Sequence, residues 1–242
     1  MKLVAGCKSH IGNTRETNQD AVTLKEFEHR GQNFIVLAVC DGVGGLEHGE
    51  IASGLAVSRV SEWFDYVTEW FDVEKAEEEL LNSHLKDLTE ECNTLVREYR
   101  FEKGLKMGTT LSLLMILRDA YYIIQVGDSR IYRYRSEQLE QLTMDASVTK
   151  IKNGKMKSYL DNYLGKQDDL WFTCANGKIQ KGDIYIVCSD GFYHQMTQQD
   201  IREYEKKLHK SRKVEEVCEE LINRMMGRGE HDNITVGVIT VD

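Results

Sequence analysis

The fold of this chain is set by one stretch of sequence, Phe34-Ile35-Val36-Leu37-Ala38-Val39-Cys40-Asp41-Gly42-Val43-Gly44-Gly45. The run before the aspartate is apolar and rich in β-branched side chains, which predicts a buried strand. An aspartate and a glycine-rich turn follow directly. Three further acidic motifs stand at the ends of apolar runs in the same way: Gly127-Asp128-Ser129-Arg130 after 121–126, Ser189-Asp190-Gly191 after 184–188, and Asp232-Asn233 before 234–239.

These aspartates predict one metal site assembled from strand ends. Carboxylates gathered at the edge of a core repel one another, and this is costly unless a cation or a shared proton offsets the repulsion. Oxygen ligands suit a hard divalent ion such as magnesium or manganese. The sequence contains no His-x-x-x-His or Cys-x-x-Cys pair that would indicate zinc.

Composition narrows the class of protein. The 242 residues, 41% of them hydrophobic, fit a single domain spanning 1–242. A formal charge of -9 argues against nucleic acid or an anionic membrane as the main partner. No apolar run approaches the roughly 20 residues of a membrane span, and six cysteines without close pairing are typical of a reducing compartment. We therefore expect a soluble, cytoplasmic protein that acts as a monomer.

The spacing of apolar residues predicts the remaining elements. Apolar side chains at helical intervals predict helices over 50–70, 74–99, 198–207 and 214–226. Over 109–142 the pattern of residues changes to apolar or alternating runs broken by short polar turns, which predicts a meander of antiparallel strands. A last strand closes the chain.

Six motifs taken together resemble the metal-dependent type 2C protein serine/threonine phosphatases, in the order and spacing of their compact bacterial branch. The resemblance runs from about residue 5 to the C-terminus, and the joint occurrence of the motifs is far more specific than any one of them. The motifs are Arg15-Glu16-Thr17-Asn18-Gln19-Asp20, Asp41-Gly42-Val43-Gly44-Gly45, Gly108-Thr109-Thr110, Gly127-Asp128-Ser129-Arg130, Ser189-Asp190-Gly191 and Asp232-Asn233-Ile234-Thr235.

The resemblance implies an α/β fold, a four-layer αββα sandwich in which two central, mostly antiparallel sheets are flanked by helices. It also implies a metal site at one end of the sandwich. By the family pattern, Asp41, Asp190 and Asp232 would hold a first ion, Mn²⁺ or Mg²⁺. Asp41 would bridge to a second ion that also takes the backbone carbonyl of Gly42.

Three further roles follow from the same resemblance. Asp20 would support the second ion through water, and Asp128 together with Asp190 could form a third, weaker site. Arg15 would bind the substrate phosphate with its planar fork of donors. Two divalent ions would acidify a bridging water for in-line attack on phosphorus, so no phosphoenzyme is required.

Two positions depart from the family pattern. Gln19 stands where many members have glutamate, which removes a negative charge near the second ion. Val43 stands where animal members carry a histidine proposed as the general acid. His48 and His231 are conceivable substitutes, although surface histidines without a catalytic role are the favoured interpretation, and a water on the metal is the preferred donor.

The segment 144–167 falls where bacterial relatives carry a flap over the cleft. Four lysines in it could attract acidic or multiply phosphorylated substrates, or simply form a solvated basic loop: Lys150, Lys152, Lys155 and Lys157.

Three functions remain open on the sequence. The leading one is a phosphatase of phosphorylated proteins that counteracts a cognate bacterial serine/threonine kinase. The second is a catalytically silent regulator that binds phosphoproteins, for which the loss of a metal carboxylate would be the signature. The third is a metal-dependent hydrolase of a small phosphate ester.

Overall fold

Strand β3 (Gln32–Asp41) lies at the centre of the fold because both of its faces are buried. Alternate side chains of a strand point to opposite faces. One set, which includes Phe34, Val36 and Ala38, packs in a core with two helices. The other set, which includes Ile35 and Leu37, packs in a second core with the other sheet. The computed structural model describes residues 1–29, 32–70, 78–152, 155–166, 170–210 and 213–242.

Two antiparallel sheets face each other across this second core. The sheet that contains β3 has the order β10-β5-β4-β3-β2, and the other has the order β1-β12-β11-β6-β7. The first sheet is completed by β2 (Asp20–His29), β4 (Leu111–Leu117), β5 (Ala120–Val126) and β10 (Thr173–Lys178). The second consists of β1 (Leu3–His10), β6 (Arg130–Arg135), β7 (Gln138–Gln141), β11 (Ile184–Cys188) and β12 (Ile234–Val241).

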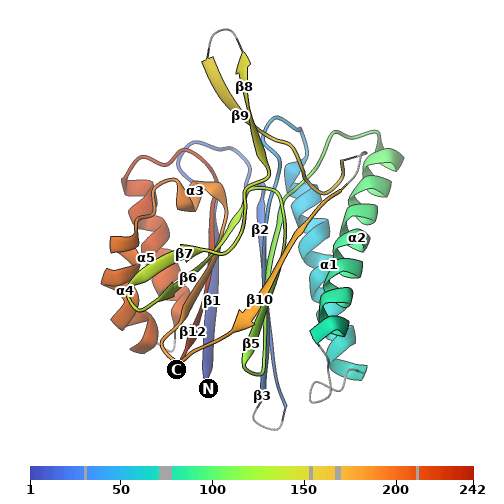
Figure 1. The fold of residues 1–242 in the computed structure, drawn as a ribbon. Coiled ribbons are helices and arrows are strands. Elements are labelled where there is room, and N and C mark those ends of the chain that lie inside the picture. The colour runs from blue at the N-terminus through green and yellow to red at the C-terminus, as the bar shows by residue number, and fades with distance from the viewer. Residues whose placement is uncertain (30–31, 71–77, 153–154, 167–169, 211–212) are drawn as a thin grey trace.

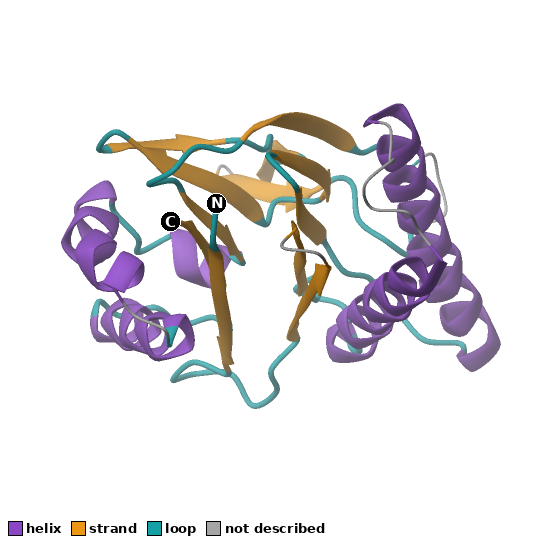
Figure 2. Ribbon diagram, turned by 90° about the horizontal axis from the view of Figure 1, so that it is seen from below, coloured by secondary structure: helices purple, strands orange, loops and turns teal. Residues whose placement is uncertain are grey.

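Helices cover the outer face of each sheet (Figures 1 and 2). Helices α1 (Gly49–Trp70) and α2 (Glu78–Lys103) pack on the sheet of β3. Helices α4 (Gln198–Lys210) and α5 (Val214–Gly227) pack on the other sheet, together with the short α3 (Asp190–Tyr193). The layers therefore follow the order α-β-β-α, which confirms the predicted sandwich.

The helices predicted from periodicity are confirmed, with small changes at their ends. The prediction for the second helix starts at residue 74, but 71–77 lie outside the described residues, and α2 is described from Glu78. The short α3 was not predicted. No helix in the described part of the chain is long and apolar enough to cross a membrane.

The meander predicted over 109–142 is wrong. Strands β4 and β5 form a hairpin in one sheet, whereas β6 and β7 form a hairpin in the other. The connection at Gly127 carries the chain between the sheets with a φ of +103°. A Cβ there would lie 2.6 Å from Cγ2 of Thr110, so only glycine fits this crossing.

Strands β8 (Ser147–Lys152) and β9 (Lys155–Leu160) form a separate two-stranded ribbon. The ribbon projects beyond the sandwich at the end where β3 finishes (Figure 1). It occupies the segment predicted as a flap. Its base is tied to the crossing between the sheets, because the Ala146 amide donates a hydrogen bond of 2.9 Å to the Gly127 carbonyl.

The helical layer over the second sheet is held by a buried carboxylate. Asp200, with its side chain 1% exposed, accepts hydrogen bonds from Arg224 at 2.8 Å and from Arg228 at 2.6 Å. It also accepts from the Thr197 backbone and hydroxyl. Burial raises the pKa of the Asp200 carboxyl, but these hydrogen bonds outweigh burial and hold the pKa well below its ordinary value.

We expect Asp200→Asn to lower the free energy of unfolding by about 3 kcal/mol, because it removes the buried counter-charge of Arg228 and one of the two counter-charges of Arg224. Urea denaturation at pH 7 measures this loss. The advantage of the native carboxylate is fully present above about pH 4 and disappears as the pH falls toward the depressed pKa. The matched control is Glu203→Gln, since Glu203 is an exposed partner of the same Arg224 and its loss should cost much less. Equal losses in the two variants would contradict the role given to Asp200.

Candidate active site

Strand pairing places two aspartates opposite each other at the end of β3. In the antiparallel register of β2 and β3, Asp20 is the direct partner of Asp41. The backbone of Asp41 is fixed on its other side by the loop before β4. The Thr110 amide donates to the Asp41 carbonyl at 2.8 Å, and the Asp41 amide donates to the Thr110 hydroxyl at 2.9 Å.

Asp190 comes from the other sheet. Strand β11 ends at Cys188, and Asp190 is the first residue of α3. The intervening Ser189 connects the two sheets, because its hydroxyl donates a hydrogen bond of 2.7 Å to Oδ2 of Asp20. The same hydroxyl accepts from the Thr235 amide at 3.0 Å. This serine therefore fixes the separation of the two strand ends that carry the acids.

Asp232 is brought against α3 by a close approach of the backbone. A Cβ on Gly191 would lie 2.1 Å from the carbonyl oxygen of Asn233 and 3.3 Å from Cβ of Asp232, so glycine is needed for the two turns to pack. Both carboxylate oxygens of Asp232 accept hydrogen bonds from Arg15, at 2.8 Å from Nε and 2.7 Å from Nη2. The predicted phosphate ligand thus pairs with a predicted metal ligand.

Asn233 organises the loop that carries Arg15, a role that sequence reasoning did not assign. Its side-chain amide donates to the carbonyls of Ile11 and Thr17, at 2.8 and 3.1 Å. Its side-chain oxygen accepts from the Gln19 amide at 2.9 Å. The only sequence signal was its place in the Asp232-Asn233 motif, which does not reveal partners more than 200 positions away.

The predicted site acids interact electrostatically. Burial first, and then the charges of neighbouring acids, raises the pKa of Asp20 to about 7 and the pKa of Asp128 to about 6. The same causes raise the pKa of Asp41 and of Asp190. The charge of Asp232 contributes to the raised pKa of Asp20, Asp41 and Asp190. All five carboxylates therefore share one electrostatic environment.

Positive charge at the site comes from Arg15. Its hydrogen bonds to Asp232 raise the pKa of its guanidinium, with smaller contributions from Asp190 and Asp41. One guanidinium cannot balance five acids, so the site fits additional cations. The donors are all oxygen, which suits a hard divalent ion. In the described part of the chain, however, no three acidic, imidazole or thiolate side chains are arranged to hold one ion as they stand.

Gly42 in the Asp41 motif lets helix α1 begin beside the acids. A Cβ on Gly42 would lie 2.7 Å from the backbone of Gly49, the first residue of α1. Gln19, one of the two departures from the family pattern, lies beside Gly42. Its carbonyl accepts from the Gly42 amide at 3.0 Å, and its side-chain amide donates to Glu50 at 3.3 Å.

The two histidines considered as proton donors have partners at the rim. Nδ1 of His231 lies 3.2 Å from the Thr14 hydroxyl, and Nδ1 of His48 lies 3.6 Å from a carboxylate oxygen of Glu50. The four flap lysines lie within β8 and β9.

The sequence model of protein phosphatase 2C matches residues 8–229. The chain therefore belongs to the protein phosphatase 2C family, and it is a metal-dependent protein serine/threonine phosphatase, as its motifs predict.

Its relatives are bacterial enzymes. It is 30% identical to the serine/threonine phosphatase stp of Listeria welshimeri, over 93% of this chain and 90% of that protein. It is 27% identical to the protein phosphatase PhpP of Streptococcus pneumoniae, over 96% of this chain and 95% of that protein.

Solved structures agree with the fold. The serine/threonine phosphatase of S. agalactiae superposes with a TM-score of 0.77 at 26% identity, covering 100% of both chains. The catalytic domain of the phosphatase PstP, solved in complex with two manganese ions, superposes with a TM-score of 0.74 at 25% identity, again covering 100% of both chains.

We expect Asp41→Asn to stabilise the metal-free protein by about 1–2 kcal/mol at pH 8, because the amide relieves burial of charge and repulsion among the acids. A carboxyl whose pKa is raised by folding destabilises the protein increasingly as the pH rises from the unfolded pKa, about 4, toward the folded pKa. The native carboxyl takes up a proton as the pH falls, so the difference should shrink toward pH 5. Thermal unfolding in chelator at pH 5, 6, 7 and 8 measures this. Asp87→Asn, on the exposed face of α2, is the control and should change little at any pH. A destabilised Asp41→Asn at pH 8 would contradict the interpretation.

Proposed function

We propose that residues 1–242 form a single phosphatase domain that hydrolyses phosphoserine and phosphothreonine in proteins at the edge where β2, β3, β11 and β12 meet. The observation that carries the proposal is that five aspartates from both sheets share one electrostatic environment, with Arg15 bonded to one of them, Asp232. Carboxylates that share a buried environment are suited to binding divalent cations, and an adjacent arginine is suited to binding a phosphate.

We propose that Asp41, Asp190 and Asp232 hold one cation, Mn²⁺ or Mg²⁺. Asp41 and the carbonyl of Gly42 would hold a second, supported by Asp20 through water. The two manganese ions of the related PstP structure support this number. Bound cations would supply Lewis acidity, lowering the pKa of a water for attack on phosphorus and balancing the charge of the phosphate oxygens.

A third and weaker cation site at Asp128 and Asp190 belongs to the same proposal. Asp190 contributes to the raised pKa of Asp128, which supports their proximity. Asp128 sits at the crossing between the sheets, one residue after Gly127, whose carbonyl holds the base of the β8–β9 ribbon. Cation binding there would therefore connect to the position of the ribbon.

Arg15 would change partner during the reaction cycle. Its Nε and Nη2 groups now donate to Asp232. If Asp232 held a cation, the same two N–H groups would be free, in a fork that matches two oxygens of a phosphate. Arg15 would then orient the phosphate and stabilise the charge that develops on it in the transition state.

We further propose that this phosphatase acts as a monomer in the cytoplasm on phosphorylated proteins, and that a cognate serine/threonine kinase adds the phosphates it removes. The names of its relatives, serine/threonine phosphatases of bacteria, support the substrate class.

The first test is hydrolysis of a phosphothreonine peptide and of para-nitrophenyl phosphate, with manganese, with magnesium and with chelator. We expect peptide turnover that depends on the cation and falls at least about 1,000-fold in both Asp41→Asn and Asp190→Asn. Full activity in both variants would contradict the site assignment. Turnover of the small ester alone would favour a non-protein substrate, and no turnover at all would favour the silent regulator.

A second test addresses Arg15. We expect Arg15→Ala to raise the Michaelis constant for the phosphothreonine peptide and to lower kcat/KM by about 10–100-fold, because a bidentate, charge-assisted contact to phosphate is lost. Arg15→Lys keeps the charge without the fork and should restore only part of the loss. Unchanged kinetic constants in Arg15→Ala would contradict its role in phosphate binding.

A further inference from the structure

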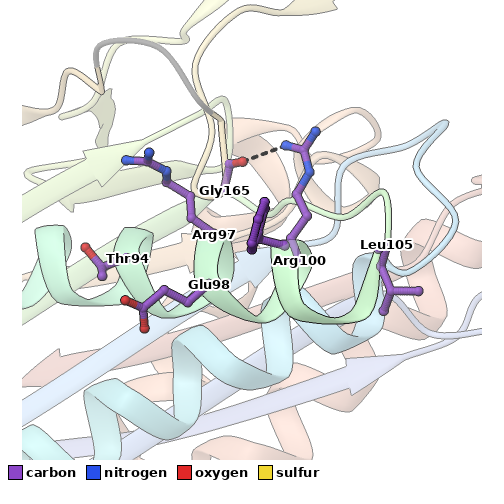
Figure 3. A pocket seen from close by; sticks show the side chains of 8 residues that line it. Thr94, Arg97, Glu98, Arg100, Leu105 and Gly165 are labelled. Atoms are coloured by element: carbon purple, nitrogen blue, oxygen red, sulfur yellow. Dashed lines mark hydrogen bonds between the residues drawn. The ribbon is translucent and has the colours of Figure 1, made fainter.

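A pocket of about 500 Å³ lies at the C-terminal end of α2 (Figure 3). It is large enough to take several side chains of a bound peptide. The last turns of α2 form one wall and the loop that follows α2 forms another. Gly165 also lines the pocket. Its lining includes Arg97, Glu98, Arg100, Phe101, Leu105 and Gly165.

The pocket is joined to the Asp41 motif by a short chain of backbone contacts. Gly165 follows Leu164, which exchanges two backbone hydrogen bonds with Thr109, of 3.2 and 2.8 Å. Thr109 in turn forms a bridge with Gly42. The loop between α2 and Thr109 therefore borders both the pocket and the turn beside the acids, so one substrate chain could contact the two together.

Two arginine side chains extend from the same side of α2, one on either side of Gly165 in the view of Figure 3. Arg97 and Arg100 are three residues apart and so share a helix face. Arg100 donates one hydrogen bond of 2.8 Å to the Gly165 carbonyl and retains other donors. Arg97 is exposed and makes no hydrogen bond or ion pair with any residue that the structure describes.

The charge at this end of α2 is opposite to the charge of the whole chain. The protein carries a formal charge of -9, yet two arginines and one glutamate, Glu98, line the pocket. Lys103 and Lys106 follow at the end of α2 and in the loop, with Glu102 beside them, so residues 97–106 carry four basic and two acidic side chains. Positive charge concentrated beside the active site of an acidic protein attracts acidic segments to that side.

An apolar contact stands next to these charges. Phe101 is 86% exposed, the most exposed of the large hydrophobic side chains that the structure describes. A single exposed apolar residue has no special meaning. A phenylalanine beside two arginines in a pocket, however, has the composition of protein-binding sites, in which aromatic and arginine side chains supply most of the binding energy.

We propose that this pocket binds an acidic segment of the phosphoprotein substrate while the phosphorylated residue occupies the active site; the inference rests on the proposed function. Aspartate or glutamate side chains of the segment pair with Arg97 and Arg100, and one large apolar side chain packs on Phe101 and Leu105. The pocket thereby selects among phosphoproteins by sequence outside the phosphorylated residue.

The test uses matched phosphothreonine peptides in which a Glu-Glu-Leu-Glu cluster, or alanines in its place, stands at several distances on either side of the phosphothreonine. We expect Arg97→Glu to lower kcat/KM about five- to tenfold for the best acidic peptide, since it replaces an attraction by a repulsion. The alanine peptides should change less than about twofold. Phe101→Ser should lower the same acidic preference, and as an exposed position it should leave folding intact.

Lys86→Glu is the matched control. It makes the same change of charge on the same helix, eleven residues before Arg97, which places it about 16 Å away along nearly the same face. The acidic preference should survive in this variant. A loss as large in Lys86→Glu as in Arg97→Glu would show a general effect of charge and overturn the proposal, as would equal losses for acidic and alanine peptides.

Binding without turnover separates this inference from the proposed function. Fluorescence anisotropy of the labelled acidic phosphopeptide, with the protein in chelator, reports docking even if no peptide is hydrolysed. We expect weaker binding to Arg97→Glu than to the native chain and to Lys86→Glu. Equal binding to all three overturns the docking site, whereas failure of the proposed function appears as absent hydrolysis of every peptide with manganese.

Discussion

Repulsion between carboxylates is the constraint on which the site depends, and the packing of two sheets is what withstands it. Asp20 and Asp41 face each other in the register of β2 and β3, while Asp190 and Asp232 come from the opposite sheet. Ser189 bonds across the gap to Asp20. The carboxylates cannot separate without breaking strand pairing in one sheet or the packing of the core between the two sheets. The apolar contacts in that core keep the two sheets together.

Much of this site could be predicted from local sequence. Asp41, Asp128 and Asp190 each end an apolar run, and Asp232 precedes one, so a strand-end metal site follows from their positions. Asp20 was different, because it starts a strand and was identified only through the family resemblance. Its place opposite Asp41 depends on the register of two ten-residue strands, which neither strand specifies alone.

Contacts made only in the folded state were not predictable. The pairing of Arg15 with Asp232 joins residues 217 positions apart. The three contacts of Asn233 likewise depend on how the N-terminal loop meets β12. The meander was wrongly predicted because the local pattern of apolar and polar residues shows where strands turn, but not which sheet each strand joins. The crossing at Gly127 is determined by its tight contact with Thr110, a tertiary effect.

The pairing of Arg15 with Asp232 also has a consequence for folding in the absence of a cation. An acid that waits unpaired for a cation would favour unfolding, but this acid has a partner supplied by its own chain. The pairing therefore lowers the repulsion that the chain must overcome to fold without a bound cation. A cation that bound Asp232 as proposed would replace this guanidinium at a surface that is already folded, and the guanidinium could return when the cation left.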